Sequence, residues 1–168
     1  MTAFRKQQTG ELDLSDKTPM WLGINFSSGV IEFDARGLGG DGSNGIGVAF
    51  HAQNDSIYDA IQIRPSKRLL PQFGTDVAYE AQPFFTWKKL RADRKTSFTK
   101  PMLPSTDADG WFHVKVSIQQ KQVKVFVNDK TDPVIEVVKL NNFDTGLVGL
   151  FTSDGFDVAN VVILKNTI

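Results

Sequence analysis

Residues 26–64 read FSSGVIEFDARGLGGDGSNGIGVAFHAQNDSIYDAIQIR, and they are the most informative part of the sequence for the architecture. Three segments in it, residues 30–36, 45–51 and 56–64, have the composition of strands. The two connections between them are short and rich in Gly, Asn and Asp, as tight turns require. The stretch therefore predicts three consecutive strands of an all-β domain.

Side chains along these strands alternate with period two, so each strand has an apolar face and a second face. On its second face the middle strand carries Gly45, Gly47 and Ala49, which let a ligand or another backbone approach closely. We expect these small residues to form a shallow floor. Its predicted rim consists of Glu32, Asp34, His51, Tyr58, Gln62 and Arg64. Alternatively, this polar surface is not a binding site but the solvated side of a half-buried antiparallel sheet.

The rest of the chain repeats this pattern of short strands and turn signals. Residues 111–129 predict a hairpin that turns near Gln120, and residues 84–95, which lack a strand period, predict a short helix or an ordered loop. The polar residues 1–10 are expected to precede the first strand. Many short strands predict a sandwich or a barrel, here one domain spanning residues 1–168. The predicted inter-sheet core consists of Ile31, Phe33, Val48, Phe50, Ile61, Ile63, Val114, Val116, Val123, Val125, Val148 and Leu150.

Composition excludes several classes of function. Nineteen basic residues balance nineteen acidic ones among 168, so no basic excess points to nucleic acid. The absence of cysteine excludes disulfides and thiolate metal sites. No apolar run has the length of a membrane span, and we expect no membrane insertion. The N-terminal residues contain no apolar signal core. The oligomeric state is not indicated by the sequence.

The order of motifs resembles that of the concanavalin A-like lectin and glucanase superfamily. The motifs are FSSGVIEFD, GIGVAF, YDAIQIRP, WFHVKV, KVFVND, GLVGLF and DVANVVI, which together span about residues 22–165. Laminin-G-like bacterial members are most similar, in particular levan-binding carbohydrate modules and, more distantly, the 3-keto-disaccharide hydrolase domain.

The resemblance implies an all-β, two-sheet antiparallel jelly-roll sandwich with one concave sheet that faces a glycan. It implies sugar contacts for Glu32, Asp34, Asp59 and Arg64, whose charged groups can pair with vicinal hydroxyls. It also favours a secreted or periplasmic location. Structural calcium is common in the superfamily, and residues 41–44 and 54–55 offer oxygen ligands, but turns are the favoured interpretation of these residues. No other cofactor is implied.

We expect carbohydrate binding without cleavage. Trp87 can stack on a sugar ring or, alternatively, plug the edge of the sandwich. A retaining glucanase of this superfamily would carry a second acid where Arg36 or Gly37 stands, so no catalytic residue is assigned.

Two other functions stay open. One is a glycoside hydrolase or polysaccharide lyase of the same fold, because His51, Tyr58 and Tyr79 are candidate bases. The other is a laminin-G-type protein-interaction module that uses loops. His113, two residues after Trp111, is expected to be structural.

Overall fold

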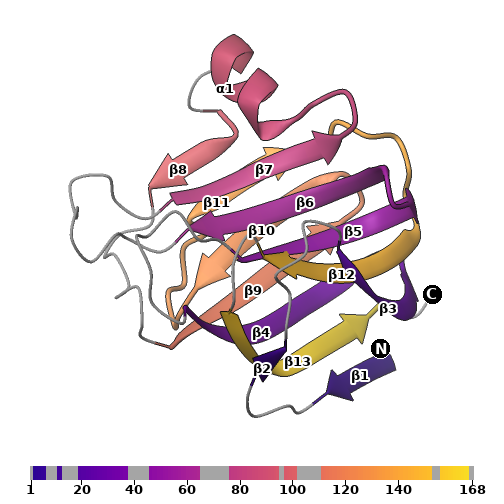
Figure 1. The fold of residues 1–168 in the computed structure, drawn as a ribbon, viewed down its shortest axis with the longest axis vertical. Helices are drawn as coiled ribbons and strands as arrows, with labels where there is room; N and C mark the ends of the chain where they lie inside the picture. The colour runs from indigo at the N-terminus through magenta and orange to yellow at the C-terminus, as the bar shows by residue number, and fades with distance from the viewer. Residues whose placement is uncertain are drawn as a thin grey trace.

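The computed structural model describes residues 2–6, 11–12, 19–37, 46–64, 76–94, 97–101, 111–152 and 156–166. Two antiparallel sheets lie one over the other (Figure 1). In order, the strands of sheet A are β1 (Thr2–Lys6), β13 (Phe156–Lys165), β4 (Gly29–Gly37), β9 (Phe112–Gln119), β10 (Gln122–Val127) and β11 (Ile135–Val138), with β2 (Glu11–Leu12) also paired to β13. Those of sheet B are β3 (Met20–Phe26), β12 (Gly146–Thr152), β5 (Ile46–Asn54), β6 (Ile57–Arg64), β7 (Asp76–Gln82) and β8 (Thr99–Pro101).

The expected all-β sandwich is confirmed, and its core lies between the two sheets. All twelve predicted core residues are buried in one hydrophobic cluster. The hairpin of β9 and β10 also forms as predicted, because Ile118 pairs with Val123 across a turn at Gln120 and Lys121. Gln120 takes the left-handed conformation of such a turn, with φ of 55°.

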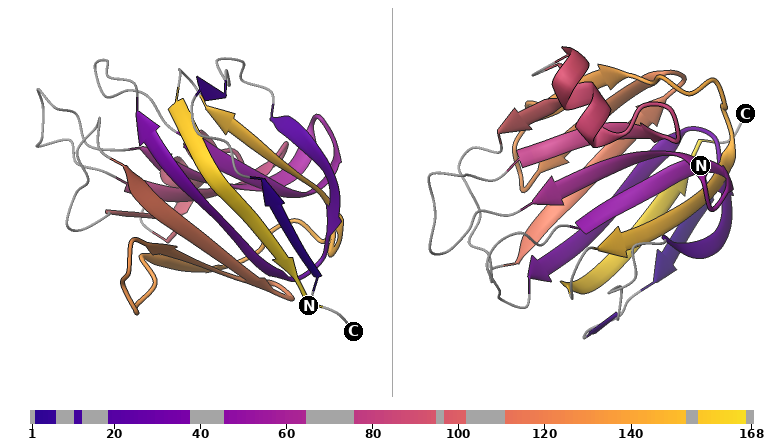
Figure 2. Two further views of the ribbon diagram at one scale, coloured as in Figure 1. Left: turned by 90° about the horizontal axis from the view of Figure 1, so that it is seen from below. Right: turned by 45° about the horizontal axis from the view of Figure 1, so that its top comes forward.

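Two segments refine the sequence interpretation. The helix α1 (Trp87–Arg94) forms where a short helix or ordered loop was expected, and it lies beside β7 at one end of sheet B (Figure 1). The expectation that residues 1–10 precede the first strand is wrong. Residues 2–6 form β1, which pairs with β13 along the edge of sheet A, so the first and last strands lie side by side (Figure 2). The sequence of β1, TAFRK, is short and alternates too weakly to be recognised as a strand.

The outer faces of the two sheets differ. In β4 and β9 buried and half-buried side chains alternate, so the outer face of sheet A is open. In β5 and β7 both faces are buried. A second hydrophobic cluster covers the outer face of sheet B, where Trp21 and Leu147 pack on Ala49, Ala52, Tyr58 and Ala60. The open face of sheet A is therefore where the described side chains leave room for a ligand.

Candidate functional site

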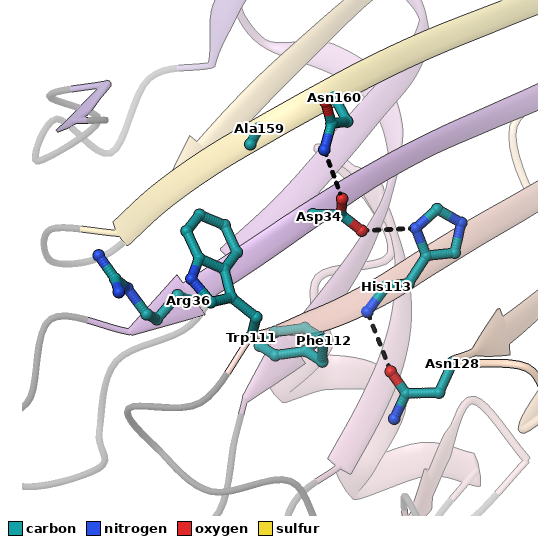
Figure 3. A pocket seen from close by; sticks show the side chains of 8 residues that line it. All are labelled: Asp34, Arg36, Trp111, Phe112, His113, Asn128, Ala159 and Asn160. Atoms are coloured by element: carbon teal, nitrogen blue, oxygen red, sulfur yellow. Dashed lines mark hydrogen bonds and ion pairs between the residues drawn. The ribbon is translucent and has the colours of Figure 1, made fainter. Parts of the chain in front are cut away.

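The carboxylate of Asp34 is the centre of a cluster on the outer face of sheet A (Figure 3). Its Oδ1 lies 2.6 Å from Nδ1 of His113, and its Oδ2 accepts a hydrogen bond of 2.8 Å from the side-chain amide of Asn160. The three residues come from three adjacent strands, β4, β9 and β13. The carboxylate is therefore fixed from both sides of its own strand.

Local backbone geometry explains this convergence. Asp34 and His113 are directly paired in the β4–β9 register, so their side chains stand on the same face. On the other side the β4–β13 register shifts between Ala159 and Val162, which marks a bulge. Asn160 lies in this bulge with φ of 54°, a conformation that asparagine tolerates better than most residues. Bulges redirect side chains, and this one directs the amide of Asn160 to Asp34.

His113 also contacts a second carboxylate. Its Nε2 lies 3.3 Å from Oε1 of Glu32, two residues before Asp34 on β4. Burial of the ring lowers the pKa of His113, but the hydrogen bonds and negative charges of Asp34 and Glu32 outweigh burial and raise that pKa above its usual value. The imidazole therefore stays protonated to higher pH than a free histidine, and in its protonated form it bridges the two acids as a cation.

An aromatic side chain borders the same cluster. Trp111 immediately precedes β9 and its side chain is 47% exposed. The Cζ atom of Arg36 lies over the indole, 4.8 Å from the ring centroid, in a cation–π contact. Arg36 has the same strand parity as Asp34, so β4 presents both residues on one face.

Asn128 closes the site where β10 ends. Its backbone NH donates to the carbonyl of His113 over 2.8 Å, and its side-chain Oδ1 accepts from the NH of His113 over 3.0 Å. This residue also has a left-handed backbone, with φ of 55°. Together these groups line an open pocket of about 590 Å³. Its lining residues are Asp34, Arg36, Trp111, Phe112, His113, Asn128, Ala159 and Asn160.

The predicted single floor does not exist. Glu32 and Asp34 stand on β4 in sheet A, whereas Tyr58 and Gln62 stand on β6 in sheet B. The three strands were expected to be neighbours because they follow one another along the chain. Instead the chain crosses between the sheets after β4 and pairs β4 with β9 and β13. Among the predicted ligand residues whose side chains are described, the structure brings only Glu32 and Asp34 into this cluster.

The outer face of sheet B holds a packed polar network. Glu80 accepts hydrogen bonds of 2.8 Å from the side chain of Gln62 and of 3.0 Å from the backbone NH of Trp87, the first residue of α1. Burial raises the pKa of Glu80 although these bonds oppose the shift. Tyr58 is buried against Trp21 on this outer face. The side chain of Arg64 lies outside the described residues.

Asp59 and His51 point into the sandwich instead of lining a surface. Asp59 accepts a hydrogen bond from the Tyr79 hydroxyl and pairs with Lys139, and the side chains of both Asp59 and Lys139 are fully buried. His51 is 1% exposed, and its Nε2 lies 2.6 Å from the carbonyl of Ser27. A register shift between Phe50 and Asn54 explains the error for His51, because a bulge reverses the alternation on which its placement depended.

The candidate calcium ligands are used in turns where they are described. Oδ1 of Asn54 accepts hydrogen bonds from the backbone NH groups of Ser56 and Ile57, over 2.8 and 3.0 Å. Asp55 accepts a hydrogen bond of 2.6 Å from the indole of Trp21. Residues 41–44 lie outside the described part of the chain. Among the side chains that are described, no group of three His, Cys, Asp or Glu residues is placed to hold a metal ion.

Sequence reasoning missed most of this pocket. The segment WFHVKV contains the signal, because period two puts Trp111 and His113 on the face opposite Phe112 and Val114. The expectation that His113 is structural overlooked its cross-strand partner Asp34. Asn128 and Asn160 carry no comparable signal, since their placement depends on left-handed backbone geometry.

The fold belongs to the concanavalin A-like, galectin-like class of β-sandwich, as expected from the sequence. No family model matches the sequence, and no curated protein matches it. Carbohydrate-binding module CBM66 from Bacillus subtilis is 12% identical with a TM-score of 0.57, over 96% of this chain and 92% of the module. A Bacillus subtilis protein of unknown function with a galectin-like fold is 13% identical with a TM-score of 0.62, over 98% and 90% of the two chains.

A native glycosidic hydrolase shares the fold as well. It is 11% identical with a TM-score of 0.58, over 87% of this chain and 68% of the hydrolase. Likeness at such low identity establishes the fold alone. Because a binding module and a hydrolase both have this fold, activity has to be argued from the pocket. No helix among the described residues is long and apolar enough to cross a membrane.

Proposed function

We propose that the protein binds a carbohydrate, without cleaving it, in the pocket beside Asp34 on the outer face of sheet A. One observation carries this proposal: a half-exposed indole, a fixed carboxylate and two asparagine side chains line the same pocket. An indole packs against the apolar face of a sugar ring, and a carboxylate accepts hydrogen bonds from hydroxyls. The fold shared with a carbohydrate-binding module supports the proposal.

The charged groups of the pocket favour binding over hydrolysis. Glycoside hydrolysis needs one carboxyl group that donates a proton and a second carboxylate that acts as nucleophile or base. Here both ring nitrogens of His113 lie within hydrogen-bonding distance of carboxylates, and both oxygens of Asp34 have partners. These groups hold each other in place, and none of those contacts leaves a proton directed at a ligand. Arg36 and Gly37 occupy the two positions at which a glucanase of the concanavalin A-like superfamily would have its second acid.

A protein partner is a weaker alternative. Apart from Trp111, the exposed large hydrophobic side chains among the described residues are Phe84, Val138 and Phe143. They belong to the connection before α1, to β11 and to the connection before β12, respectively. Single exposed hydrophobic residues are common on folded proteins, and a docking surface requires a contiguous patch.

The test combines a glycan array with calorimetry. We expect the wild-type protein to bind a glycan on the array, and Trp111→Ala and Asp34→Asn each to weaken binding of that glycan about 10- to 100-fold. That range corresponds to losing about 1.5–3 kcal/mol from a stacking contact or a charged hydrogen bond. Trp21→Phe, which changes an indole on sheet B, is the matched control and should bind normally. Thermal melting verifies that each variant is folded.

Three results would contradict the proposal. Absence of any glycan hit would remove the function, and normal binding by Trp111→Ala would remove the pocket. Loss of binding in Arg64→Ala with normal binding in Asp34→Asn would place the ligand on sheet B instead. A reducing-sugar assay run in parallel covers catalysis: release of reducing ends that Asp34→Asn abolishes would make the protein an enzyme.

A further inference from the structure

We propose that the glycan-binding surface continues from the pocket across β9 and β10 to Phe126, so that its ligand is a linear oligosaccharide and not a single sugar. This inference rests on the proposed function and names the ligand class of the same site. Trp111 holds one sugar unit in the pocket, and Phe126 holds a later unit of the same chain. Affinity therefore depends on the length of the chain.

The strand register places Phe126 on the same face as the pocket. Phe126 pairs with Lys115 across β10 and β9, and Lys115 pairs with Glu32 across β9 and β4. Directly paired residues have their side chains on one face of a sheet. Lys115 is also two residues after His113 on β9, so both side chains stand on the outer face of sheet A. The pocket and Phe126 therefore belong to one continuous surface.

The spacing of the two aromatic residues suits a chain. Trp111 precedes Lys115, the register partner of Phe126, by four residues, which corresponds to about 13 Å along the strands, and the step from β9 to β10 adds about 5 Å across them. One sugar ring, which is about as wide as the spacing between two strands, cannot stack on both side chains. A chain that lies diagonally over β9 and β10 can contact both.

Polar groups line the path between and beyond the two rings. Asn128 follows Phe126 by two residues on the same face and belongs to the pocket lining. Its Oδ1 accepts from the backbone NH of His113, and its amide nitrogen is the part that donates to a ligand. Ser117 and Lys124, which are paired in register, continue this polar surface past Phe126. A chain of sugar hydroxyls thus meets donors and acceptors along the whole path.

The ring of Phe126 can exchange its present partner for a sugar. Buried and half-buried side chains alternate along β10, and Phe126 is one of the half-buried, outward-facing ones. Nζ of Lys115 lies 5.3 Å from its ring centroid. Cation–π contacts at exposed sites are weak, so a sugar ring can displace the ammonium, whose flexible stem lets it donate to sugar hydroxyls instead. The alternative is that Phe126 only packs across the strands against Lys115.

The experiment measures how affinity depends on chain length. The probes are linear gluco-, manno-, xylo-, galacto- and fructo-oligosaccharides, from monosaccharide to hexasaccharide, screened on an array and titrated by calorimetry. If the array hit lies outside these series, the hit and its terminal disaccharide take their place. For the wild-type protein we expect affinity to rise about tenfold from the disaccharide to the tetrasaccharide, or to the whole hit, as one further aromatic contact provides.

Substitutions at Phe126 test the source of this rise. Phe126→Leu keeps an apolar side chain but removes the ring, and it should abolish the rise without changing the affinity for the disaccharide. Phe126→Tyr keeps the ring and should retain the rise. Trp111→Ala should weaken binding of both chain lengths. Phe84→Ala, which removes a phenylalanine that is 71% exposed in the connection before α1, is the control and should change neither affinity. Thermal melting verifies that each variant is folded.

The outcomes separate the two proposals. If no probe binds and the array has no hit, the proposed function fails, and this inference fails with it. If longer chains bind no tighter than the disaccharide, or if the rise persists in Phe126→Leu, carbohydrate binding stands and the extended surface is overturned. If Phe126→Leu weakens the disaccharide as much as the tetrasaccharide, Phe126 only supports the structure of the pocket, and the inference is again overturned.

Discussion

Lys139 and Asp59 form an ion pair that joins the two sheets inside the sandwich, with Nζ 3.4 Å from Oδ2 and neither side chain exposed. Asp59 belongs to β6 in sheet B, and Lys139 follows β11 in sheet A. Burial raises the pKa of Asp59 and lowers that of Lys139, and the charge of each partner opposes both shifts. The hydroxyl of Tyr79 donates to the other oxygen of Asp59. The pair is thus structural, although Asp59 was predicted to contact sugar.

Removing one partner of this pair should be strongly destabilising. Lys139→Ala would leave a carboxylate buried without its counter-charge, and we expect a loss of about 3–5 kcal/mol in the free energy of unfolding. Urea titration followed by fluorescence measures it. Lys124→Ala, on the outer face of β10, should change stability by less than about 0.5 kcal/mol. A loss below about 1 kcal/mol in Lys139→Ala would show that the pair is hydrated in solution.

His51 should make the fold sensitive to acid. Burial and the positive charge of Lys139 lower the pKa of His51 to about 4, whereas an unfolded histidine titrates near 6.5. Between these values the unfolded chain binds the additional proton, so this contribution to stability is complete above pH 6.5 and falls as pH drops toward 4, by about 3 kcal/mol. In His51→Asn the new side chain does not titrate, so the loss of stability between pH 6.5 and 4 should disappear. Asparagine also tolerates the φ of 52° at this position.

The measurement is the difference between wild-type and variant unfolding free energies at several pH values, which cancels the other titrating groups. His113 provides a control of opposite sign, because its pKa is raised in the folded state. Its contribution is complete below pH 6.5 and is lost as pH rises through the folded pKa. Parallel pH profiles for the wild type and His51→Asn would mean that His51 is accessible to protons in the folded state.

Gly29 should be irreplaceable where β4 starts. Its φ is 139°, and a Cβ there would lie 1.9 Å from the carbonyl oxygen of Leu164 on β13. We expect Gly29→Ala to destabilise by about 3 kcal/mol or more, from backbone strain and overpacking together. Gly23→Ala is the matched comparison: φ is 68°, but nothing lies within 4 Å of the added Cβ. It should cost only the strain of about 1–2 kcal/mol. Equal melting temperatures for both variants would disprove the close approach.

The core was predictable from sequence because period two is a local property. Ile31, Phe33, Val114 and Val116 alternate with polar neighbours, and each strand could be assigned an inner face without knowing its partners. Which strands lie next to each other is not a local property of the sequence. β4 pairs with β9, whose residues lie about eighty positions later in the chain. The prediction of a single floor was wrong because it took strands that follow one another in the chain to be neighbours. Chain order does not determine which sheet contains each strand.

The site was predictable only in part for a second reason. Glu32 and Asp34 could be recognised as two acids on one strand face, but their partner His113 is set by the pairing of β4 with β9 within sheet A. Bulges then change which way a side chain points. One moves His51 into the interior, and another directs Asn160 to Asp34. Tertiary pairing decides the position of a bulge, so periodicity alone does not reveal it.

Asn160 connects backbone geometry to ligand binding, and two substitutions separate these roles. Asn160→Gly keeps the left-handed conformation but removes the amide that donates to Asp34. We expect its melting temperature to match that of the wild type and its affinity for the array glycan to fall about fivefold, the effect of one lost hydrogen bond of about 1 kcal/mol. Asn160→Ala also adds backbone strain of about 1–2 kcal/mol and should therefore melt lower. Calorimetry and thermal melting on the same samples measure both effects. If Asn160→Gly binds the glycan normally, Asn160 is needed only for the bulge, and Asp34 does not depend on its amide.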